Sequence, residues 1–118
     1  MNKDWVQTTK DLSSALKDLR GGAPAVMQGF SAIAQAALKT NALDTKTKEL
    51  IALAIGVATR CDGCIAFHAE AAVKQGASRE EVLETMGMAI YMGAGPSVMY
   101  AAQALEAFDQ FQDIKNQA

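Results

Sequence analysis

Apolar residues recur every three or four positions along most of the chain, which is the spacing of amphipathic helices. The first such segment covers residues 4–19 and ends at Gly21-Gly22, because glycine is common just after a helix. Pro24 opens a second helix, a position that proline favours because its missing N–H would be unpaired there. Asn41 is expected to end that helix. Its apolar stripe consists of Val26, Met27, Phe30, Ile33, Ala34, Ala37 and Leu38.

The pattern predicts four more helices, over residues 44–60, 61–75, 78–92 and 96–112. Asp44 is a suitable N-cap for the first of them, and the segment that begins at Ser78 carries a capping box. The glycine- and proline-rich turn at residues 93–96 separates the last two. No strand alternation and no internal repeat is found. We therefore expect an all-α bundle of five to six helices and a single domain over residues 1–118.

Half of the residues are hydrophobic, and the excess comes largely from alanine, with few aromatics. Such a composition suits closely packed helices with short side chains between them. Several of the predicted helices are apolar on more than one face, and so small a monomer cannot hide that much surface. Association into a homo-oligomer is the expected outlet.

Charge and hydropathy exclude several classes of function. The net charge is −2 and the basic residues are scattered, so no nucleic-acid-binding surface is predicted. The N-terminus, Met1 to Trp5, is polar and has no apolar core of a signal peptide. The longest apolar run, Leu50 to Ala58, is far too short to span a bilayer. We expect a cytoplasmic protein with no membrane partner.

Both cysteines and the only histidine lie within one short stretch, Cys61-Asp-Gly-Cys64 followed by His68. A thiol becomes a nucleophile by losing its proton, and the first turn of a helix favours the resulting charge. The spacing brings the two sulfurs to one side, close enough to form a disulfide. His68 lies one turn beyond Cys64 on the same face and can accept the proton of that thiol. We expect a partly dry pocket around Cys64, with Cys61 nearer to solvent.

In a reducing compartment a close cysteine pair is more often redox-active or metal-binding than structural. A Cys61–Cys64 bridge would stabilise the fold by only about 2 kcal/mol in the chain-entropy model. Zinc is the main competing use, but a closed structural site needs about four ligands and the cysteines and histidine supply three. We expect no cofactor and no bound metal.

Glu49 is a carboxylate at the edge of an apolar strip that contains Ala52, Leu53 and Gly56. A carboxylate in such a place usually has a partner, because an unpaired buried charge is costly. His68 is the expected partner. The alternative is an ion pair at the surface with Lys46 or an ordinary solvated glutamate, and periodicity alone favours it.

Taken together, Glu49, eleven intervening residues, the Cys61/Cys64 pair and His68 resemble the active-site signature of the alkylhydroperoxidase AhpD-like proteins, which belong to the carboxymuconolactone decarboxylase superfamily. The similarity covers about residues 25–110, including the turn at residues 93–96. It implies an all-α fold that assembles into homotrimers or homohexamers, and a thiol-dependent peroxidase activity. The best-known members carry a second histidine just before the second cysteine, where this chain has Gly63.

The resemblance also assigns roles to the site residues. It implies that Cys64 attacks the peroxide, that Cys61 resolves the sulfenate as a disulfide, and that Glu49 and His68 form the proton relay that activates Cys64. A dithiol, such as that of a lipoyl-bearing protein, would then restore the thiols. Two alternatives remain: a disulfide oxidoreductase or redox sensor without peroxidase activity, and an enzyme like the decarboxylase branch, which shares the scaffold but does not use a Cys-x-x-Cys.

Overall fold

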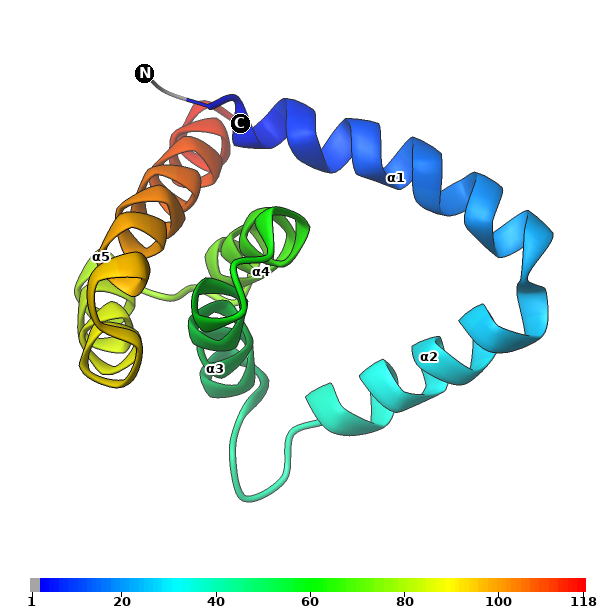
Figure 1. Ribbon diagram of the computed structural model, residues 1–118, viewed down its shortest axis with the longest axis horizontal. Helices are drawn as coiled ribbons and strands as arrows, with labels where there is room; N and C mark the ends of the chain where they lie inside the picture. The colour runs from blue at the N-terminus through cyan, green and yellow to red at the C-terminus, as the bar shows by residue number, and fades with distance from the viewer. Residues whose placement is uncertain (1–2) are drawn as a thin grey trace.

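The computed structural model describes residues 3–118, and within them it contains helices and no strand (Figure 1). The helices are α1 (Trp5–Gly22), α2 (Pro24–Leu38), α3 (Thr45–Ala58), α4 (Asp62–Lys74) and α5 (Arg79–Gln117). The prediction of an all-α fold is confirmed. Met1 and Asn2, which belong to the polar N-terminus considered above, lie outside the described residues.

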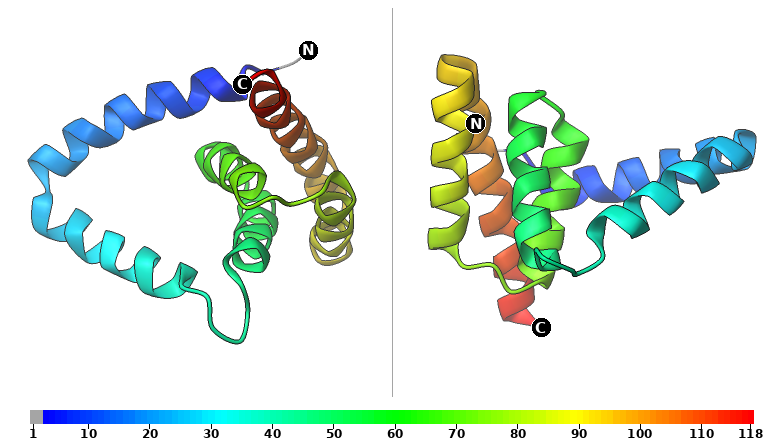
Figure 2. Two further views of the ribbon diagram at one scale, coloured as in Figure 1. Left: turned by 180° about the vertical axis from the view of Figure 1, so that it is seen from behind. Right: turned by 90° about the horizontal axis from the view of Figure 1, so that it is seen from below.

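The sharpest feature of the backbone is the reversal of α5 at Ala94, which has non-helical angles (φ 54°, ψ −142°). Arg79 Nε donates to Asp109 Oδ1 at 3.0 Å, although 30 positions separate the two residues. Along an uninterrupted helix that separation would be about 45 Å. Figure 2 shows the two halves running side by side in opposite directions. The break expected between residues 92 and 96 is therefore present.

Residues before and after Ala94 allow the two halves to meet so closely. A Cβ on Gly93 would collide with the side chain of Ser97, which is itself buried, so only glycine fits there. Pro96 begins the second half, where its missing N–H removes no helical hydrogen bond across the reversal.

The expected helix starts are found, but several of the expected ends are not, and the last helix runs on to Gln117 rather than ending at residue 112. The side chain of Asp44 accepts the N–H of Thr47, and the capping box of Ser78 and Glu81 is complete. The second helix ends at Leu38 and not at Asn41, because the hydroxyl of Thr45 donates to the Leu38 carbonyl at 2.8 Å and satisfies it there. The first helix continues through both glycines to Gly22.

The core lies where α3, α4 and both halves of α5 pack against one another, and the start of α1 closes it at one end. The largest side chains that are fully buried there are Trp5, Phe108, Leu53, Ile65, Val57 and Val82. Alanines fill much of the remaining contact surface, which agrees with the composition. Within the described residues no helix is both long and apolar enough to cross a bilayer.

Helix α2 stands away from this core, as Figures 1 and 2 show, and none of its residues is buried. The stripe predicted from its periodicity is present but faces outward: Val26 is 72% exposed, Phe30 63% and Ile33 67%. Ile51 and Ile55 of α3 are also exposed. A single chain therefore leaves large apolar side chains of two helices open to water, as proteins often do at interaction sites.

Candidate active site

A tight turn between α3 and α4 sets the position of Cys61. Arg60, with φ 58°, occupies the left-handed conformation, and its N–H donates to the Val57 carbonyl at 3.1 Å. The N–H of Cys61 donates to the Gly56 carbonyl at 3.0 Å. These two bonds form a Schellman motif, in which the chain leaves the helix in one fixed direction. Cys61 is thereby held at the N-cap of α4.

The same motif ends α4, but with glycine in the left-handed position. Gly76, with φ 78°, donates to Val73, and Ala77 donates to Ala72. Glycine adopts this conformation without strain, whereas a residue with a Cβ is held there at a cost in free energy. The turn that carries the first cysteine is therefore the more strained of the two.

We expect Arg60→Gly to raise the free energy of unfolding by about 1 kcal/mol, because it removes this strain and Arg60 is exposed. Urea unfolding of the reduced protein measures the change. Gly76→Ala is the matched control and is expected to lower the free energy of unfolding, since its Cβ would meet no atom within 4 Å and only the backbone conformation opposes it. A loss of stability in Arg60→Gly would contradict the assignment of strain.

Cys61 and Cys64 form a disulfide with their Cα atoms 5.2 Å apart. The Sγ of Cys61 also accepts the N–H of Cys64 at 3.1 Å, as an N-cap side chain does. On the other side, a Cβ on Gly56 of α3 would lie 3.1 Å from the Cβ of Cys64, so glycine allows α3 to approach this cysteine closely. Both cysteines are half-buried, and the expected difference in their exposure is not seen in this oxidised form.

Glu49 and His68 are in direct contact, as expected. The Nδ1 of His68 lies 2.7 Å from the Oε1 of Glu49, whose residue is only 6% exposed. The alternative partner, Lys46, pairs instead with Glu81 at 2.9 Å. The hydrogen bond from Lys46 holds the pKa of the Glu81 carboxyl below its usual value, so this second pair stays ionised. Glu49 is therefore free of Lys46 and bound to the imidazole.

This contact fixes the imidazole's chemistry. An ionised carboxylate only accepts hydrogen bonds, so when Glu49 is ionised, Nδ1 of His68 carries the proton, and a neutral ring then has its lone pair on Nε2. Nε2 is then the atom able to take up a proton. No hydrogen bond joins His68 to either sulfur among the residues described, in the oxidised form. The structure thus joins the glutamate to the histidine and the two cysteines to each other.

Gly63, the departure from the family signature, is in contact with α1. A Cβ at this position would lie 2.9 Å from Cδ1 of Leu12, so the space that a side chain would need is already filled. Periodicity placed Leu12 on the apolar face of the first helix but did not indicate what it covers. A glycine between two cysteines is the only sign in the sequence that another backbone or side chain approaches closely there.

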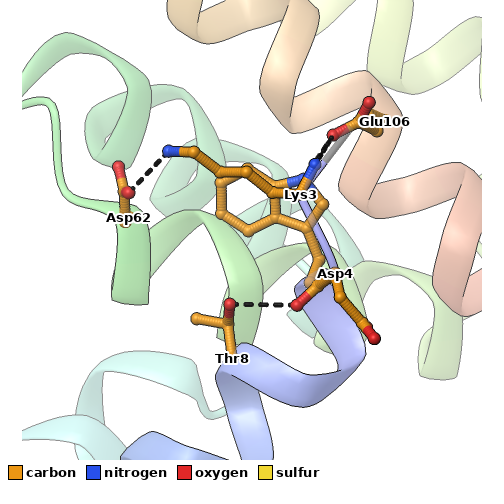
Figure 3. Close-up of polar contacts among 6 residues, drawn as sticks. Lys3, Asp4, Thr8, Asp62 and Glu106 are labelled. Atoms are coloured by element: carbon orange, nitrogen blue, oxygen red, sulfur yellow. Dashed lines mark hydrogen bonds and ion pairs between the residues drawn. The ribbon is translucent and has the colours of Figure 1, made fainter. Parts of the chain in front are cut away.

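Within residues 3–118 no group of three or more histidine, cysteine, aspartate or glutamate side chains is arranged to hold a metal ion. The side chains of the turn at residues 61–64, called the redox turn below, are instead engaged with each other and with the segment that precedes α1. Asp62, between the cysteines, pairs with Lys3 at 2.8 Å (Figure 3). This pair is half exposed and of small energetic weight.

The chain as a whole is similar to several known proteins. A model of the carboxymuconolactone decarboxylase family matches residues 24–107. A protein of Haemophilus influenzae is 44% identical over 108 residues, which are 92% of this chain and 96% of that protein. A solved structure of a family member from Legionella pneumophila, apo-lpg0406, is 57% identical, with a TM-score of 0.90 over 92% of this chain and 96% of that one.

A second solved structure, that of TM1620 from Thermotoga maritima, is 28% identical. It has a TM-score of 0.73 and covers 80% of this chain and 97% of its own. It is described as a carboxymuconolactone decarboxylase family protein, and a part in an antioxidative response has been suggested for it.

Proposed function

Since this chain belongs to the carboxymuconolactone decarboxylase family, we propose that it is an AhpD-like alkyl hydroperoxide reductase that cycles through a Cys61–Cys64 disulfide. The observation that carries the proposal is the pairing of this disulfide, at the start of α4, with a buried Glu49–His68 contact one helical turn further along. Residues 1–118 would act as one domain, with its core at about residues 25–110.

In the first step the Cys64 thiolate attacks a peroxide oxygen. An S–O bond forms, the O–O bond breaks, and the leaving alkoxide takes up a proton to become an alcohol. Cys64 is then a sulfenic acid. The sulfur of Cys61 attacks it, an S–S bond forms, and the sulfenic oxygen leaves as water. One hydroperoxide has been reduced and two thiols oxidised.

An external dithiol closes the cycle by thiol–disulfide exchange. Its two sulfurs become a disulfide, and its two hydrogens return to Cys61 and Cys64. A lipoyl-bearing protein is a suitable donor because its dithiol forms a ring disulfide on oxidation. The cycle needs no cofactor in this chain and would operate in a reducing compartment such as the cytoplasm.

Glu49 and His68 would supply the proton transfers. Nε2 of His68 accepts the proton of the Cys64 thiol, and Glu49 orients the ring and stabilises the imidazolium that results. The low exposure of Glu49 supports this role, because a buried carboxylate in a low-dielectric site interacts strongly with a nearby positive charge. In the reduced protein the thiol, no longer bound to Cys61, can turn toward the ring.

The test is peroxide consumption by the purified protein with dihydrolipoamide as reductant and cumene hydroperoxide as substrate. We expect turnover that saturates with the dithiol and produces one alcohol for each dithiol oxidised. A protein whose disulfide is reduced and reformed without peroxide consumption would be a disulfide oxidoreductase or sensor instead. That second function is favoured by one observation, the absence of a hydrogen bond from His68 to either sulfur within the described residues.

The decarboxylase reaction of the same superfamily is the less favoured alternative. A decarboxylase has no use for the cysteine pair that this chain places at the N-terminus of α4. Decarboxylation of a muconolactone by the Cys61→Ser variant at the wild-type rate would support that alternative over the peroxidase.

We further propose that the chain acts as a homotrimer or homohexamer in which the exposed stripe of α2 is covered by another copy. Burial of large apolar side chains contributes about 1.5–3 kcal/mol each, and Val26, Phe30 and Ile33 offer three on one helix. Such a surface suits a stable interface better than contact with water.

For this oligomer we expect light scattering to give three or six times the chain mass of 12.5 kDa. Phe30→Glu places a charge in the apolar stripe and is expected to shift the mass toward that of one chain. Lys10→Glu, on the exposed face of α1, is the control and is expected to leave the mass unchanged. A monomeric wild-type protein at micromolar concentration would overturn this assignment.

A further inference from the structure

Helix α1 lies outside the residues matched by the family model, which begin at 24, and yet it contacts the redox turn. One contact comes from α1 itself, and a second comes from Lys3, two positions before the helix begins. Leu12 packs against Gly63, and the Lys3 ammonium pairs with Asp62. Asp62 and Gly63 are the two residues between the cysteines, so α1 reaches the second of them and the segment just before α1 reaches the first.

The start of α1 is fixed in place by the second half of α5. Trp5 is fully buried, and its indole N–H donates to Oε1 of Glu106 at 2.9 Å. Its backbone N–H donates to Oε1 of Gln110 at 2.7 Å, and the side chain of Gln110 donates back to the Lys3 carbonyl at 2.6 Å. Figure 3 shows the Lys3 side chain reaching from this anchor toward Asp62.

Leu12 follows Trp5 by seven positions, which is two turns of helix, so both project from the same side of α1. The buried tryptophan therefore fixes the position of α1 along its axis, and with it the point at which Leu12 contacts the redox turn. Glycine at position 63 lets the leucine methyl approach the backbone between the two cysteines. Helix α3 approaches the turn elsewhere, through Gly56 and Cys64. The redox turn thus contacts α1 through Gly63 and α3 through Cys64.

We infer that α1 is a cover over the redox turn, and that Leu12 is a specificity-determining residue that limits the size of the reagent able to reach Cys61 and Cys64. The inference rests on the proposed function only in that the cysteine pair must be reducible. Small peroxides and thiols pass between α1 and the rest of the site, whereas bulky ones meet the Leu12 side chain. Shortening that side chain opens the approach without touching the cysteines, Glu49 or His68.

Alkylation of the reduced protein tests this cover directly. Iodoacetamide and 5-iodoacetamidofluorescein carry the same reactive group on a small and a bulky body, and mass spectrometry gives the rate constant of each at the two cysteines. The ratio of the small to the bulky rate constant measures steric access. In Leu12→Ala we expect this ratio to fall about tenfold relative to wild type.

Two further variants separate access from a general loosening of the fold. Leu12→Met keeps the volume of the side chain and is expected to keep the wild-type ratio. Leu19→Ala makes the same truncation at an exposed position of the same helix and is also expected to keep it. An unchanged ratio in Leu12→Ala, or an equal fall in Leu19→Ala, would overturn the cover.

The alkylation ratio does not depend on peroxide turnover, so the two proposals fail separately. A wild-type protein that consumes no peroxide, but whose ratio falls in Leu12→Ala, would lose the peroxidase function and retain the cover. If the wild-type protein consumes peroxide normally but the ratio is unaltered in Leu12→Ala, the peroxidase function is retained and the cover is lost.

Discussion

Cys64→Ser is expected to consume no hydroperoxide above the uncatalysed rate, a loss of more than about 10³-fold. The substitution removes the sulfur that forms the S–O bond, and a serine hydroxyl at the same place is not acidic enough to replace it. The measurement is peroxide consumption with dihydrolipoamide, followed by the loss of cumene hydroperoxide. The variant also cannot form the disulfide, so the isolated protein should carry one titratable thiol.

Cys61→Ser is the matched control, because it removes the other sulfur of the same bridge. It is expected to react once with peroxide and to stop at a Cys64 sulfenic acid, which dimedone traps and mass spectrometry locates. Sustained turnover by Cys64→Ser would sink the assignment of Cys64 as the attacking residue. Trapping of a sulfenic acid on Cys61 in that variant would reverse the two roles.

Glu49→Ala is expected to lower the kcat/KM for peroxide by about 10²-fold, the lower end of what a general acid–base system contributes. The substitution leaves His68 without the acceptor that holds the proton on Nδ1, so Nε2 is no longer fixed as the basic atom. It also removes a negative charge that would stabilise the imidazolium. The measurement compares kcat/KM of Glu49→Ala and of the wild type across a range of pH. The loss of a base changes the pH dependence of kcat/KM as well as its value.

The control for Glu49 is Glu70→Ala, a second glutamate close to the site. Glu70 lies on α4 and makes only a 3.9 Å contact with Lys74, so its removal is expected to leave both rate and profile unchanged. Circular dichroism of each variant checks the fold, since Glu49 is buried and Glu70 is not. Equal rates for wild type and Glu49→Ala would remove the proton relay from the mechanism.

The sequence was sufficient where the determining interactions are local. Asp44 and Ser78 mark helix starts because the N–H groups that they cap lie within three residues of them, and Pro24 does so because it has no N–H to leave unpaired. The Glu49–His68 contact, which crosses between helices, was expected mainly from the family signature, because periodicity alone favoured a solvated glutamate or a surface pair with Lys46.

Features that depend on distant parts of the chain were not foreseen. Periodicity identified the apolar stripe of α2 but could not show that the chain leaves it uncovered, because a helical period contains no information on what packs against it. Trp5 looked like one more apolar position. Its partner Glu106 is 101 positions away, and nothing local to either residue signals the pairing. The contact between Leu12 and Gly63 could not be predicted for the same reason, since 51 positions separate the two residues.

The pairing of Trp5 with Glu106 and Gln110 has a consequence for how the protein is made. A ribosome adds roughly 5–20 residues per second, so Trp5 waits on the order of 5–20 s for partners that follow it by 101 and 105 positions. During that time α3 and α4 can form without α1, and the cysteines emerge before their cover can dock. A nascent chain would therefore present an open redox turn to the oxidants and thiols around it. Fluorescence of Trp5, the only tryptophan, would report the moment at which the finished chain closes over it.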